Sequence, residues 1–450
     1  MSLLSATAKT LVVGLGKTGL SCARYLRSQG IATVVADSRE NPPGLQQLRE
    51  ALPEVAVYVG GFEPEVFETA ARLVVSPGVP VSEPLVQAAA ARGVEVIGDI
   101  ELFARAAQAP ICAITGSNGK STVTTLVGQM AEAAGRRVAV GGNLGEPALE
   151  LLDVSIERYV LELSSFQLES TFNLHADVAV VLNVSADHMD RYPDLDTYAR
   201  TKARIYRGAR VAVVNRDDPI VVAMPREAAL EIGFTLGEPT GSDFGVRVHD
   251  GVRWICRGTQ PLMLASEVRI AGLHNLANAL AALALACGCG LPMEQSCAVL
   301  RRFSGLPHRS ELVAERDGVC WYDDSKGTNP GATVAALEGL MPLGSTGRVV
   351  LIAGGEGKGA DFAPLRSAVR RSARAVVLIG RDAGMIARAL DGEVPLVEAA
   401  SMQDAVVRAA EIARPGDTVL LSPACASFDM FDSYEHRGRV FAEAVRGLGT

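Results

Sequence analysis

The sequence has no apolar run that approaches the roughly 20 residues needed to span a bilayer. Its N-terminal apolar stretch, 11–15, is followed at once by glycine and by the charged Lys17, unlike a secretory signal. The eight cysteines are scattered, without a C-x-x-C pair or the spacing of metal ligands. We therefore expect a cytoplasmic protein without membrane insertion, whose thiols are reduced and mostly buried.

A surplus of positive charge is also lacking, because the formal net charge is −8 at pH 7. This balance argues against a protein that binds nucleic acid through a basic face. Aromatic residues make up only 5% of the chain, whereas hydrophobic residues make up 48% and there are 45 glycines. That composition favours an α/β fold. Because 450 residues are too many for one ordinary hydrophobic core, we expect several domains.

One stretch, 111–125, predicts a site for a nucleoside triphosphate. Its apolar start is typical of a buried strand, its middle is the turn T-G-S-N-G-K-S-T, and its end begins a helix. Backbone N–H groups in such a turn bind phosphate oxygens, Lys120 adds a positive charge, and the Ser121 hydroxyl can reach Mg²⁺. Ile114 stands where the common pattern has its first glycine, so the loop is a shorter variant. The predicted phosphate-binding residues are Gly116, Ser117, Asn118, Gly119, Lys120, Ser121 and Thr122.

Near the N-terminus, a second glycine-rich turn has the pattern of a dinucleotide-binding site. A strand precedes Gly14, Gly16 and Gly19, a helix follows them, and Asp37 comes directly after the next predicted strand, 31–36. Taken alone, this fingerprint suggests an NAD-dependent dehydrogenase, but the same turn can hold the diphosphate of a UDP-sugar. A turn that serves only the tight packing of a helix on a strand is a third interpretation.

Several polar residues follow predicted strands. Glu162 ends a buried strand beside the phosphate loop, where a carboxylate can hold Mg²⁺, although pairing with a Lys or Arg would also explain it. His188 follows the strand 178–182, and a lone histidine is more often a structural hydrogen-bonding group than a ligand. Lys202 lies in a predicted helix, 196–206, where the sequence pattern alone predicts a solvated charge.

Other turns are open to two interpretations. Ser76 and Gly78 follow a strand at the sheet edge where ligands bind, yet a plain structural turn explains them equally well. Asn143 lies in a glycine turn with the same ambiguity. Asn275 and Asn278 are one turn apart at the start of a long helix, so both amides can face one ligand, or cap the helix instead.

These signals divide the chain into three segments. We place the boundaries at residues 1–98, 99–305 and 306–450. The stretch 243–270 alternates between apolar and polar residues, which predicts short antiparallel strands in the central segment. The last segment has four apolar strands that end in Gly, Lys or Ser loops, which predicts a second Rossmann-like sheet with its ligand edge on one side.

Ten motifs in this order resemble those of the Mur ligases, and the resemblance covers essentially the whole chain. The motifs are G-L-G-K-T-G, T-G-S-N-G-K-S-T, G-G-N-L-G, L-E-L-S-S-F-Q-L, D-H-M-D-R-Y, H-N-L-A-N-A-L, G-L-P-H-R, D-D-S-K-G-T-N, G-G-E-G-K-G-A-D-F and S-P-A-C-A-S-F-D. The last two favour those members of the family that add D-glutamate. The short spacing of the phosphate loop also fits this family.

The resemblance implies three α/β domains: an N-terminal Rossmann-like domain that binds a UDP-sugar, a central P-loop ATPase-like domain, and a C-terminal Rossmann-like domain that binds the incoming amino acid. It implies ATP-driven addition of D-glutamate to UDP-N-acetylmuramoyl-L-alanine in cytoplasmic peptidoglycan synthesis. The substrate carboxylate would attack the γ-phosphate of ATP, and the amine of D-glutamate would then attack the resulting acyl phosphate. Two Mg²⁺ sites and a monomeric enzyme are expected.

The resemblance also implies roles for individual residues. The catalytic residues would be Lys120, Glu162, His188 and Lys202, and the Mg²⁺ ligands would be Ser121, Glu162, His188 and a carbamylated Lys202. Further contacts to ATP would come from Asn275, Asn278, Arg309 and Asp324. The UDP-sugar would meet Gly14, Gly16, Lys17, Thr18, Gly19, Asp37, Ser38, Arg39, Ser76, Gly78 and Asn143. The D-glutamate pocket would contain His188, Lys326, Thr328, Lys358, Ser427 and Tyr434.

Three other functions stay open at this point. Another ligase of the same superfamily, of the L-alanine-adding or folylpolyglutamate type, would share most of these motifs. An NAD-dependent oxidoreductase with an accessory ATPase would account for the N-terminal fingerprint. A non-catalytic binding module gated by a nucleotide would use the phosphate loop without turnover.

Overall fold

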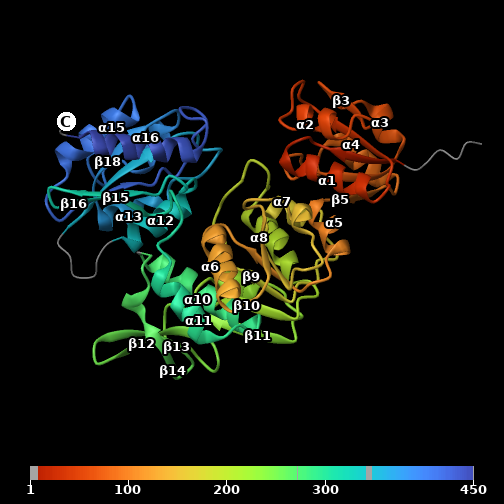
Figure 1. Ribbon diagram of the computed structural model, residues 1–450. Coiled ribbons are helices and arrows are strands. Elements are labelled where there is room, and N and C mark those ends of the chain that lie inside the picture. Colours follow the sequence, from red (N-terminus) through yellow and green to blue (C-terminus); the bar gives the residue numbers. More distant parts are fainter. Residues whose placement is uncertain (1–8, 271, 341–346, 449–450) are drawn as a thin grey trace, which may run out of the picture.

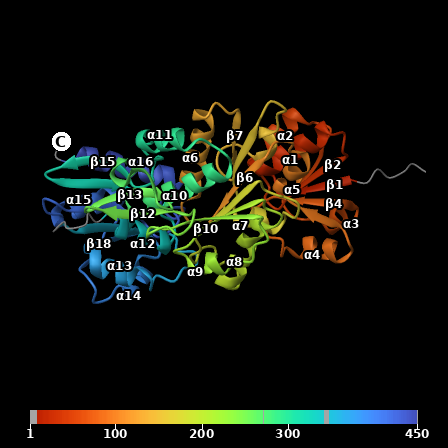
Figure 2. The same ribbon diagram turned by 90° about the horizontal axis from the view of Figure 1, so that it is seen from below.

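The computed structural model describes residues 9–270, 272–340 and 347–448, which form three α/β domains in chain order. The central domain lies between the N-terminal and C-terminal domains in both views of the ribbon (Figures 1 and 2). Each domain is built around one sheet, of five, nine and six strands respectively. The expected three-domain α/β fold is therefore confirmed. Among the described residues, no helix is long and apolar enough to cross a membrane.

The N-terminal sheet is parallel throughout, with the order β3-β2-β1-β4-β5. Its elements are β1 (Lys9–Val13), α1 (Lys17–Ser28), β2 (Thr33–Asp37), α2 (Leu45–Ala51), β3 (Ala56–Val59), α3 (Pro64–Glu68), β4 (Ala70–Val75), α4 (Pro84–Ala91) and β5 (Glu95–Ile97). The strand order reverses between β1 and β4, and the loops after these two strands form the crevice where such sheets bind ligands. The glycine turn after β1 and the turn at Ser76 after β4 both lie there.

The central sheet has a parallel part, β12-β11-β10-β9-β6-β8-β7, and the strands β13 and β14 extend it from β12 by antiparallel pairing. The antiparallel strands expected within 243–270 are thus present. The strands are β6 (Ile111–Thr115), β7 (Val138–Gly142), β8 (Arg158–Glu162), β9 (Val178–Val181), β10 (Val211–Asn215), β11 (Leu230–Phe234), β12 (Phe244–His249), β13 (Val252–Arg257) and β14 (Gln260–Leu264). The helices are α5 (Asp99–Ala106), α6 (Lys120–Ala133), α7 (Ser165–Glu169), α8 (Leu195–Ala203), α9 (Pro219–Ala223), α10 (Leu273–Gly288) and α11 (Met293–Arg302), with 3₁₀ turns η1 (Ala148–Leu151), η2 (Arg204–Tyr206) and η3 (Ala265–Glu267).

The C-terminal sheet has the order β15-β16-β20-β17-β18-β19, and only the edge strand β15 runs antiparallel to its neighbour. Its strands are β15 (Glu311–Arg316), β16 (Val319–Asp323), β17 (Val349–Gly354), β18 (Ala373–Ile379), β19 (Leu396–Glu398) and β20 (Thr418–Leu421). Its helices are α12 (Pro330–Gly339), α13 (Leu365–Ser372), α14 (Ala383–Ala389), α15 (Met402–Ile412) and α16 (Tyr434–Gly447).

The long alanine-rich stretch forms helix α10, and the packing of this helix explains why the stretch is buried. It packs against α6, α11, α12 and the strands β10 and β11, so it contacts protein on nearly every side. The side chains from Ala279 to Ala286 are fully buried, and small residues allow the neighbouring helices to approach closely. This packing holds the start of α10 beside the start of α6, where the phosphate loop ends. All eight cysteines are free thiols, and six of them are buried.

Candidate active site between the central and C-terminal domains

The phosphate loop leaves β6 and enters α6 at Lys120, as the sequence predicts. Gly119 has φ +82°, and a Cβ there would lie 2.3 Å from Oδ1 of Asn278. Glycine suits this position, because a side chain there would be strained at this φ and would displace the amide of Asn278. The Lys120 ammonium is partly buried and donates to the carbonyls of Gly116 and Ser117 at 2.8 and 2.9 Å. Burial lowers the pKa of Lys120, whereas the nearby carboxylate of Glu162 raises it.

Glu162 ends β8, directly beside the phosphate-loop strand, because Ile114 and Glu162 pair across the sheet. Its Oε1 accepts a hydrogen bond of 2.6 Å from the side-chain amide of Asn143. Its Oε2 is buried and has no hydrogen-bond partner. Among the described residues no Lys or Arg forms an ion pair with this carboxylate, so the paired alternative is not seen. A buried acceptor without a partner fits a bound cation.

His188 lies in the loop after β9 and reaches the same space. Its ring contacts the edge of the Phe166 ring, with centroids 4.8 Å apart. Burial lowers the pKa of His188, and the positive charges of Lys358 and Lys120 lower it further, although Asp187 raises it. A neutral imidazole is the form that offers a lone pair to a metal ion.

Lys202 is buried, with only 1% of its surface exposed, so the solvated charge predicted from the helical pattern is wrong. Helix α8 packs on α7 and turns this side chain towards the phosphate loop. The ammonium donates to the carbonyl of Gly116 at 2.9 Å and lies 4.5 Å from the centre of the Tyr198 ring. Burial and the neighbouring charge of Lys120 hold the pKa of Lys202 well below its ordinary value. Its neutral amine is the nucleophilic form that carbamylation requires.

The C-terminal domain completes the site. A cavity of about 650 Å³ lies between the central and C-terminal domains and contains most of the predicted catalytic and D-glutamate-binding residues. Lys326 lies 4.0 Å from the centre of the Tyr434 ring, and burial lowers the pKa of Lys326 to about 8. The predicted residues that line this cavity are Ser117, Asn118, Gly119, Lys120, Ser121, Asn143, Glu162, His188, Lys202, Arg309, Lys326, Thr328, Lys358, Ser427 and Tyr434.

Direct contacts hold the two domains together around this cavity. Arg309, in the segment that joins them, donates to the Ser121 hydroxyl at 2.7 Å. Asn329, which caps α12 of the C-terminal domain, donates to Oδ2 of Asp187 at 3.0 Å and to Oδ1 of Asn118 at 3.2 Å. The C-terminal domain therefore contacts the phosphate loop and the loop after β9 directly.

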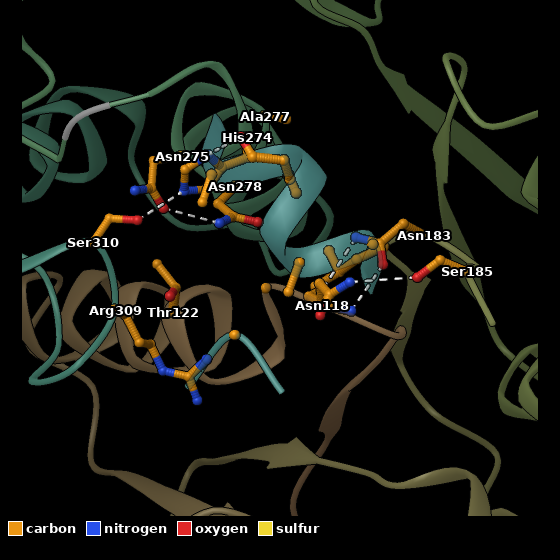
Figure 3. Close-up of a pocket in the computed structure, with 18 of the residues that line it drawn as sticks. Asn118, Thr122, Asn183, Ser185, His274, Asn275, Ala277, Asn278, Arg309 and Ser310 are labelled. Atoms are coloured by element: carbon orange, nitrogen blue, oxygen red, sulfur yellow. Dashed lines mark hydrogen bonds between the residues drawn. The ribbon is translucent and has the colours of Figure 1, made fainter. Parts of the chain in front are cut away.

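A second cavity, of about 280 Å³, adjoins the phosphate loop and is drawn in Figure 3. Asn275 and Asn278 line one wall, and Nδ2 of Asn278 donates to Oδ1 of Asn275 at 3.1 Å. The residue at the N-cap position of this helix is Gly272, which has no side chain to cap it. The other predicted residues that line this cavity are Asn118, Gly119, Thr122, Arg309, Asp324 and Lys326.

The pKa values of two titratable groups at this cavity are shifted towards the neutral form. Burial raises the pKa of Asp324 to about 7, although its carboxylate accepts hydrogen bonds from Ser422 and Ser310. Burial lowers the pKa of His274 to about 4. A cavity with neutral polar edges suits the base and sugar of a nucleotide.

The remaining predicted residues form a separate group at the carboxyl edge of the N-terminal sheet. Asp37 accepts hydrogen bonds from the backbone of Leu15 and from the guanidinium of Arg39, and these lower its pKa although burial alone would raise it. Ser76 donates to the carbonyl of Gly14 at 2.8 Å. The group as a whole comprises Gly14, Gly16, Lys17, Thr18, Gly19, Asp37, Ser38, Arg39, Ser76 and Gly78.

The packing interpretation of the glycine turn holds for one of its glycines. A Cβ on Gly19 would lie 1.9 Å from the carbonyl oxygen of Gly14, so this glycine is needed for helix α1 to pack on β1. Lys17 reaches the central domain, where it donates to the carbonyl of Gly145 at 2.9 Å. Gly145 and Asn143 line the 650 Å³ cavity between the central and C-terminal domains, which we call the catalytic cavity. The N-terminal turn therefore adjoins that cavity.

Some residues of the site were not predicted. Asn183 follows β9 and both donates to and accepts from the backbone of Asn118, and its place after a strand was the available signal. Arg437 of α16 is 1% exposed and donates to the carbonyls of Ser325 and Ala426, which adjoin Lys326 and Ser427. Nothing in the sequence around Arg437 indicates this support.

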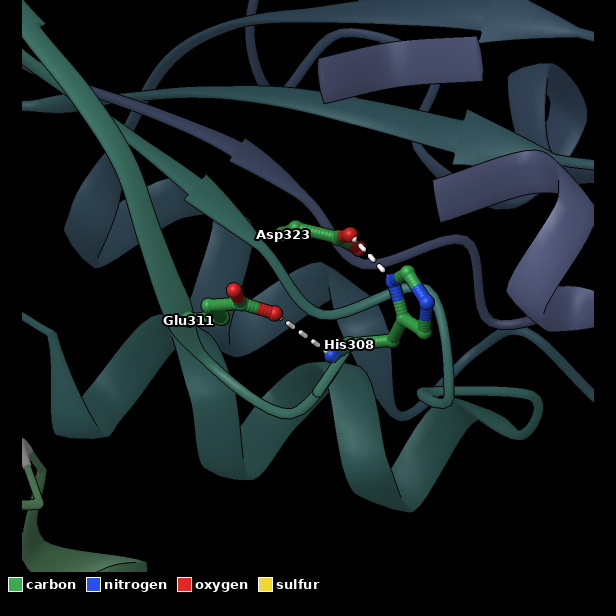
Figure 4. Close-up of side chains that lie close together, drawn as sticks. All are labelled: His308, Glu311 and Asp323. Carbon is green, nitrogen blue, oxygen red and sulfur yellow. Dashed lines mark hydrogen bonds and ion pairs between the residues drawn. The ribbon is translucent and has the colours of Figure 1, made fainter. Parts of the chain in front are cut away.

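His308, Glu311 and Asp323 also lie close together, with possible ligand atoms within 4.8 Å of one another (Figure 4). Nδ1 of His308 is 2.6 Å from Oδ2 of Asp323, and the hydrogen bond to this carboxylate raises the pKa of His308. The backbone N–H of His308 donates to Glu311 at 2.9 Å. The cluster is thus explained as an ion pair that fixes the segment before Arg309.

Family models match the chain in three successive parts. Residues 8–98 match the model "Mur ligase MurD-like, N-terminal domain". Residues 114–286 match "Mur ligase middle domain", and residues 308–425 match "Mur ligase, glutamate ligase domain".

Curated relatives are similar over their full length. The UDP-N-acetylmuramoylalanine–D-glutamate ligase of Marinobacter nauticus is 56% identical over 448 residues, covering 100% of both chains. The ligases of the same name from Pseudomonas putida and Pseudomonas aeruginosa are 55% and 54% identical, covering 100% of this chain and 99% and 100% of their own.

Solved structures of more distant proteins share the fold. MurF of Acinetobacter baumannii aligns with a TM-score of 0.61 at 18% identity, over 98% of this chain and 92% of its own. The UDP-N-acetylmuramate–alanine ligase of Thermotoga maritima aligns with a TM-score of 0.60 at 18% identity, over 97% and 99%.

Proposed function

The chain belongs to the Mur ligase family, and we infer that it catalyses the ATP-dependent addition of D-glutamate to UDP-N-acetylmuramoyl-L-alanine in peptidoglycan synthesis. Relatives that carry this activity in their name are more than half identical to it from end to end. The observation that carries the inference within the structure is one cavity that joins the phosphate loop to the lysines of the C-terminal domain. A triphosphate and a dicarboxylate amino acid can meet there.

The reaction is proposed to pass through an acyl phosphate. An oxygen of the substrate carboxylate forms a bond to the γ-phosphorus of ATP, and the bond to ADP breaks. The amine of D-glutamate then bonds to the acyl carbon, loses a proton, and phosphate leaves. Lys120 is placed to neutralise the transferred phosphoryl group, because its ammonium lies in the loop that holds the phosphates.

We assign the binding of ATP to the phosphate loop and to the second cavity. Gly116, Ser117, Asn118, Gly119, Ser121 and Thr122 would hold the phosphates, and Asn275, Asn278, Arg309 and Asp324 would surround the nucleoside and its phosphates. The amides of Asn275 and Asn278 can exchange their mutual hydrogen bond for bonds to a base edge. Arg309 can likewise exchange the Ser121 hydroxyl for a phosphate oxygen.

The buried, unpartnered Oε2 of Glu162 fits a divalent cation. We propose that Mg²⁺ is held at two sites by Ser121, Glu162, His188 and Lys202 as its carbamate. Mg²⁺ supplies charge neutralisation to the phosphate oxygens when it is bound. The lowered pKa of buried Lys202 supports the carbamate, because a lower pKa favours the neutral amine and only a neutral amine can add to CO₂.

The D-glutamate pocket is assigned to the opposite wall of the cavity. Lys326 and Lys358 supply two positive charges for the two carboxylates of D-glutamate, and Thr328, Ser427 and Tyr434 supply hydroxyl groups. His188 lies between this pocket and the phosphate loop. The chemistry of this wall favours an acidic amino acid.

The UDP group is assigned to the crevice of the N-terminal domain. Gly14, Gly16, Lys17, Thr18 and Gly19 would meet the diphosphate, and Asp37, Ser38, Arg39, Ser76 and Gly78 would surround the uridine. Asn143, which holds Glu162, would meet the sugar end of the substrate. The same proposal includes three further points. The domains are residues 1–98, 99–305 and 306–450, the enzyme acts in the cytoplasm, and it is a monomer.

The test is a phosphate-release assay with purified protein, ATP, Mg²⁺ and UDP-N-acetylmuramoyl-L-alanine. D-Glutamate should support phosphate release, whereas meso-diaminopimelate and L-alanine should not. A parallel assay replaces the acceptor with UDP-N-acetylmuramate. Activity only with L-alanine and that acceptor would overturn the assignment, as would tight NAD binding without any UDP-sugar binding.

A further inference from the structure

Arg191 lies at the junction of the N-terminal and central domains and has no role in the reaction as proposed. It comes from the D-H-M-D-R-Y segment, three residues after His188. Its side chain is only 13% exposed, although arginine usually lies at the surface. A buried guanidinium must be fully paired to be stable, so its partners indicate what it does.

Two of these partners belong to the N-terminal domain. Nη1 of Arg191 donates to the carbonyl of Pro77 at 2.7 Å, and Nη2 makes a longer contact of 3.5 Å with the carbonyl of Val79. The turn they belong to packs on the diphosphate loop, because Ser76 donates to the carbonyl of Gly14 at 2.8 Å. Arg191 therefore forms hydrogen bonds to the turn that makes one wall of the proposed UDP pocket.

The other partners belong to the central domain. Nη2 donates to Oε2 of Glu169 at 2.6 Å, and the guanidinium carbon lies 4.0 Å from the centre of the Phe166 ring. Glu169 is itself held, since its Oε1 accepts from the Tyr192 hydroxyl at 2.6 Å. The Phe166 ring in turn contacts His188. One side chain thus connects the wall of the UDP pocket to the ring that supports His188.

Other side-chain contacts between these two domains differ in kind, because Lys17 with Glu146 and Arg24 with Glu150 are exposed pairs. Lys17 donates to the carbonyl of Gly145, but its side chain is 62% exposed, and exposed contacts of this type contribute little. Arg191 uses the planar fork of its guanidinium for a carbonyl, a carboxylate and an aromatic face at once. A lysine cannot reproduce this set, because its ammonium is a single point.

From these contacts, and resting on the function proposed above, we propose that Arg191 is a positioning residue. It fixes the UDP pocket of the N-terminal domain relative to His188, so that a substrate held by its UDP group presents its carboxylate at the phosphate loop. UDP alone needs only the N-terminal pocket. The full acceptor must span both domains and needs the fixed separation.

The experiment compares the binding of UDP and of UDP-N-acetylmuramoyl-L-alanine to the full-length protein by calorimetry. Arg191→Lys and Arg191→Met are the test variants, and the second keeps an unbranched apolar chain against Phe166. Arg200→Lys and Arg200→Met are the matched controls, because Arg200 lies on the nearby helix α8, is 66% exposed and, among the described residues, pairs only with groups on that helix. Thermal unfolding checks that each variant is folded.

We expect both Arg191 variants to bind the full acceptor at least tenfold more weakly and to bind UDP within twofold of wild type. The KM for that acceptor should rise in parallel, whereas the KM values for ATP and D-glutamate should stay within twofold. The Arg200 variants should match wild type in every measurement.

Equal weakening of UDP and the full acceptor would overturn the proposal, since it would show only that the UDP pocket is damaged. Unchanged binding of both would overturn it too. If Arg191→Met does not fold, Arg191→Lys decides alone. A wild-type protein that forms no product with D-glutamate would instead count against the proposed function.

Discussion

The lysines of the catalytic cavity are held by carbonyl oxygens and aromatic rings, not by carboxylates. Lys120 and Lys202 share the carbonyl of Gly116, and Lys326 lies over the Tyr434 ring. The charges of Lys120 and Lys326 are therefore available to anionic substrates, and burial makes each of these two charges more effective than it would be in water, whereas Lys202 is proposed to react as its neutral amine. The cost is a lowered pKa for all three residues.

Lys202 gives a test of the proposed carbamate. Lys202→Ala should lose more than 90% of activity, because a carbamate that binds Mg²⁺ would be missing, and millimolar formate or acetate should restore part of it. The rate of phosphate release checks this, with Arg200→Ala as the control on the same helix. Loss of activity without any rescue by a short carboxylate would argue against the carbamate.

The raised pKa of the buried Asp324 can be tested through the pH dependence of stability. With its pKa raised from 3.8 to about 7, it keeps a proton in the folded protein that the unfolded chain releases at a lower pH. The folded state thus binds more protons between these values, and its stability falls as the pH rises through them. Asp324→Asn should remove this term, so that between about pH 5 and pH 7 the free energy of unfolding falls by about 2 kcal/mol less than in wild type.

Urea unfolding at a series of pH values measures that difference directly. Asp99 also has a raised pKa and His274 a lowered one, so both contribute to the total slope. The difference between wild type and Asp324→Asn isolates one group. Parallel curves for the two proteins would show that Asp324 is ionised in the folded state.

At the scale of elements, the site is built from loops at the carboxyl ends of parallel strands. The central domain contributes loops after β6, β8 and β9, and the C-terminal domain contributes loops after β16, β17 and β20. The two sets face each other across one cavity. A sheet supplies fixed positions in this way while the loops carry the chemistry.

Gly119 tests how closely the phosphate loop and α10 must approach. Gly119→Ala should weaken ATP binding at least tenfold and destabilise the fold by about 1–3 kcal/mol, because the new Cβ would collide with Asn278. Gly135→Ala is the matched control. Gly135 follows the same helix and has a similar φ of +73°, but a Cβ there would meet no neighbouring atom within 4 Å. Equal effects of the two substitutions on ATP affinity would show that backbone strain, not the collision, is responsible.

Much of the fold follows from sequence pattern, and the exceptions have a physical cause. Central strands such as β6 and β17 are buried on both faces and therefore have continuous apolar sequences. The strands β3, β15 and β19 were not predicted, because they lie at sheet edges and are only partly buried, and β11, inside the central sheet, was missed because its first two residues are exposed. Their side chains carry too little periodic signal to distinguish them from loops.

Site residues could be predicted where a polar side chain lies at the end of a strand or in the loop after it. They were harder to predict where tertiary packing determines whether a side chain reaches the cavity. Glu162 and His188 follow strands and lie at the cavity. The burial of Lys202 depends on which face of α8 meets the phosphate loop, which the helical pattern did not reveal. Arg191 and Arg437 act through contacts with segments more than 100 residues away, and no local pattern encodes such contacts.

At the scale of the whole molecule, two interfaces bring three domains to one cavity. Arg191 connects the N-terminal domain to the loop of His188. Asn329 and Arg309 connect the C-terminal domain to the phosphate loop. In the proposed function each substrate is held by a different domain, so the rate should depend on how the domains meet.

Asn329 tests the second interface. Asn329→Asp can still cap α12, as the native side chain does by accepting from the N–H of Ala332, but it places a negative charge against Asp187. We expect kcat to fall at least tenfold, binding of the UDP-substrate to stay within twofold, and the radius of gyration from small-angle scattering to increase. Asn329→Ser, which also can cap the helix but adds no charge, should show a smaller fall. An unchanged kcat in Asn329→Asp would show that these contacts do not govern closure.

The central claim is that the cavity activates a carboxylate by phosphoryl transfer before it forms the amide. The direct measurement uses UDP-N-acetylmuramoyl-L-alanine labelled with ¹⁸O in its carboxylate, together with ATP, Mg²⁺ and D-glutamate. If an acyl phosphate forms, one labelled oxygen must leave with phosphate for each amide made, and mass spectrometry should find it there. Released phosphate without ¹⁸O, alongside amide formation, would contradict the account.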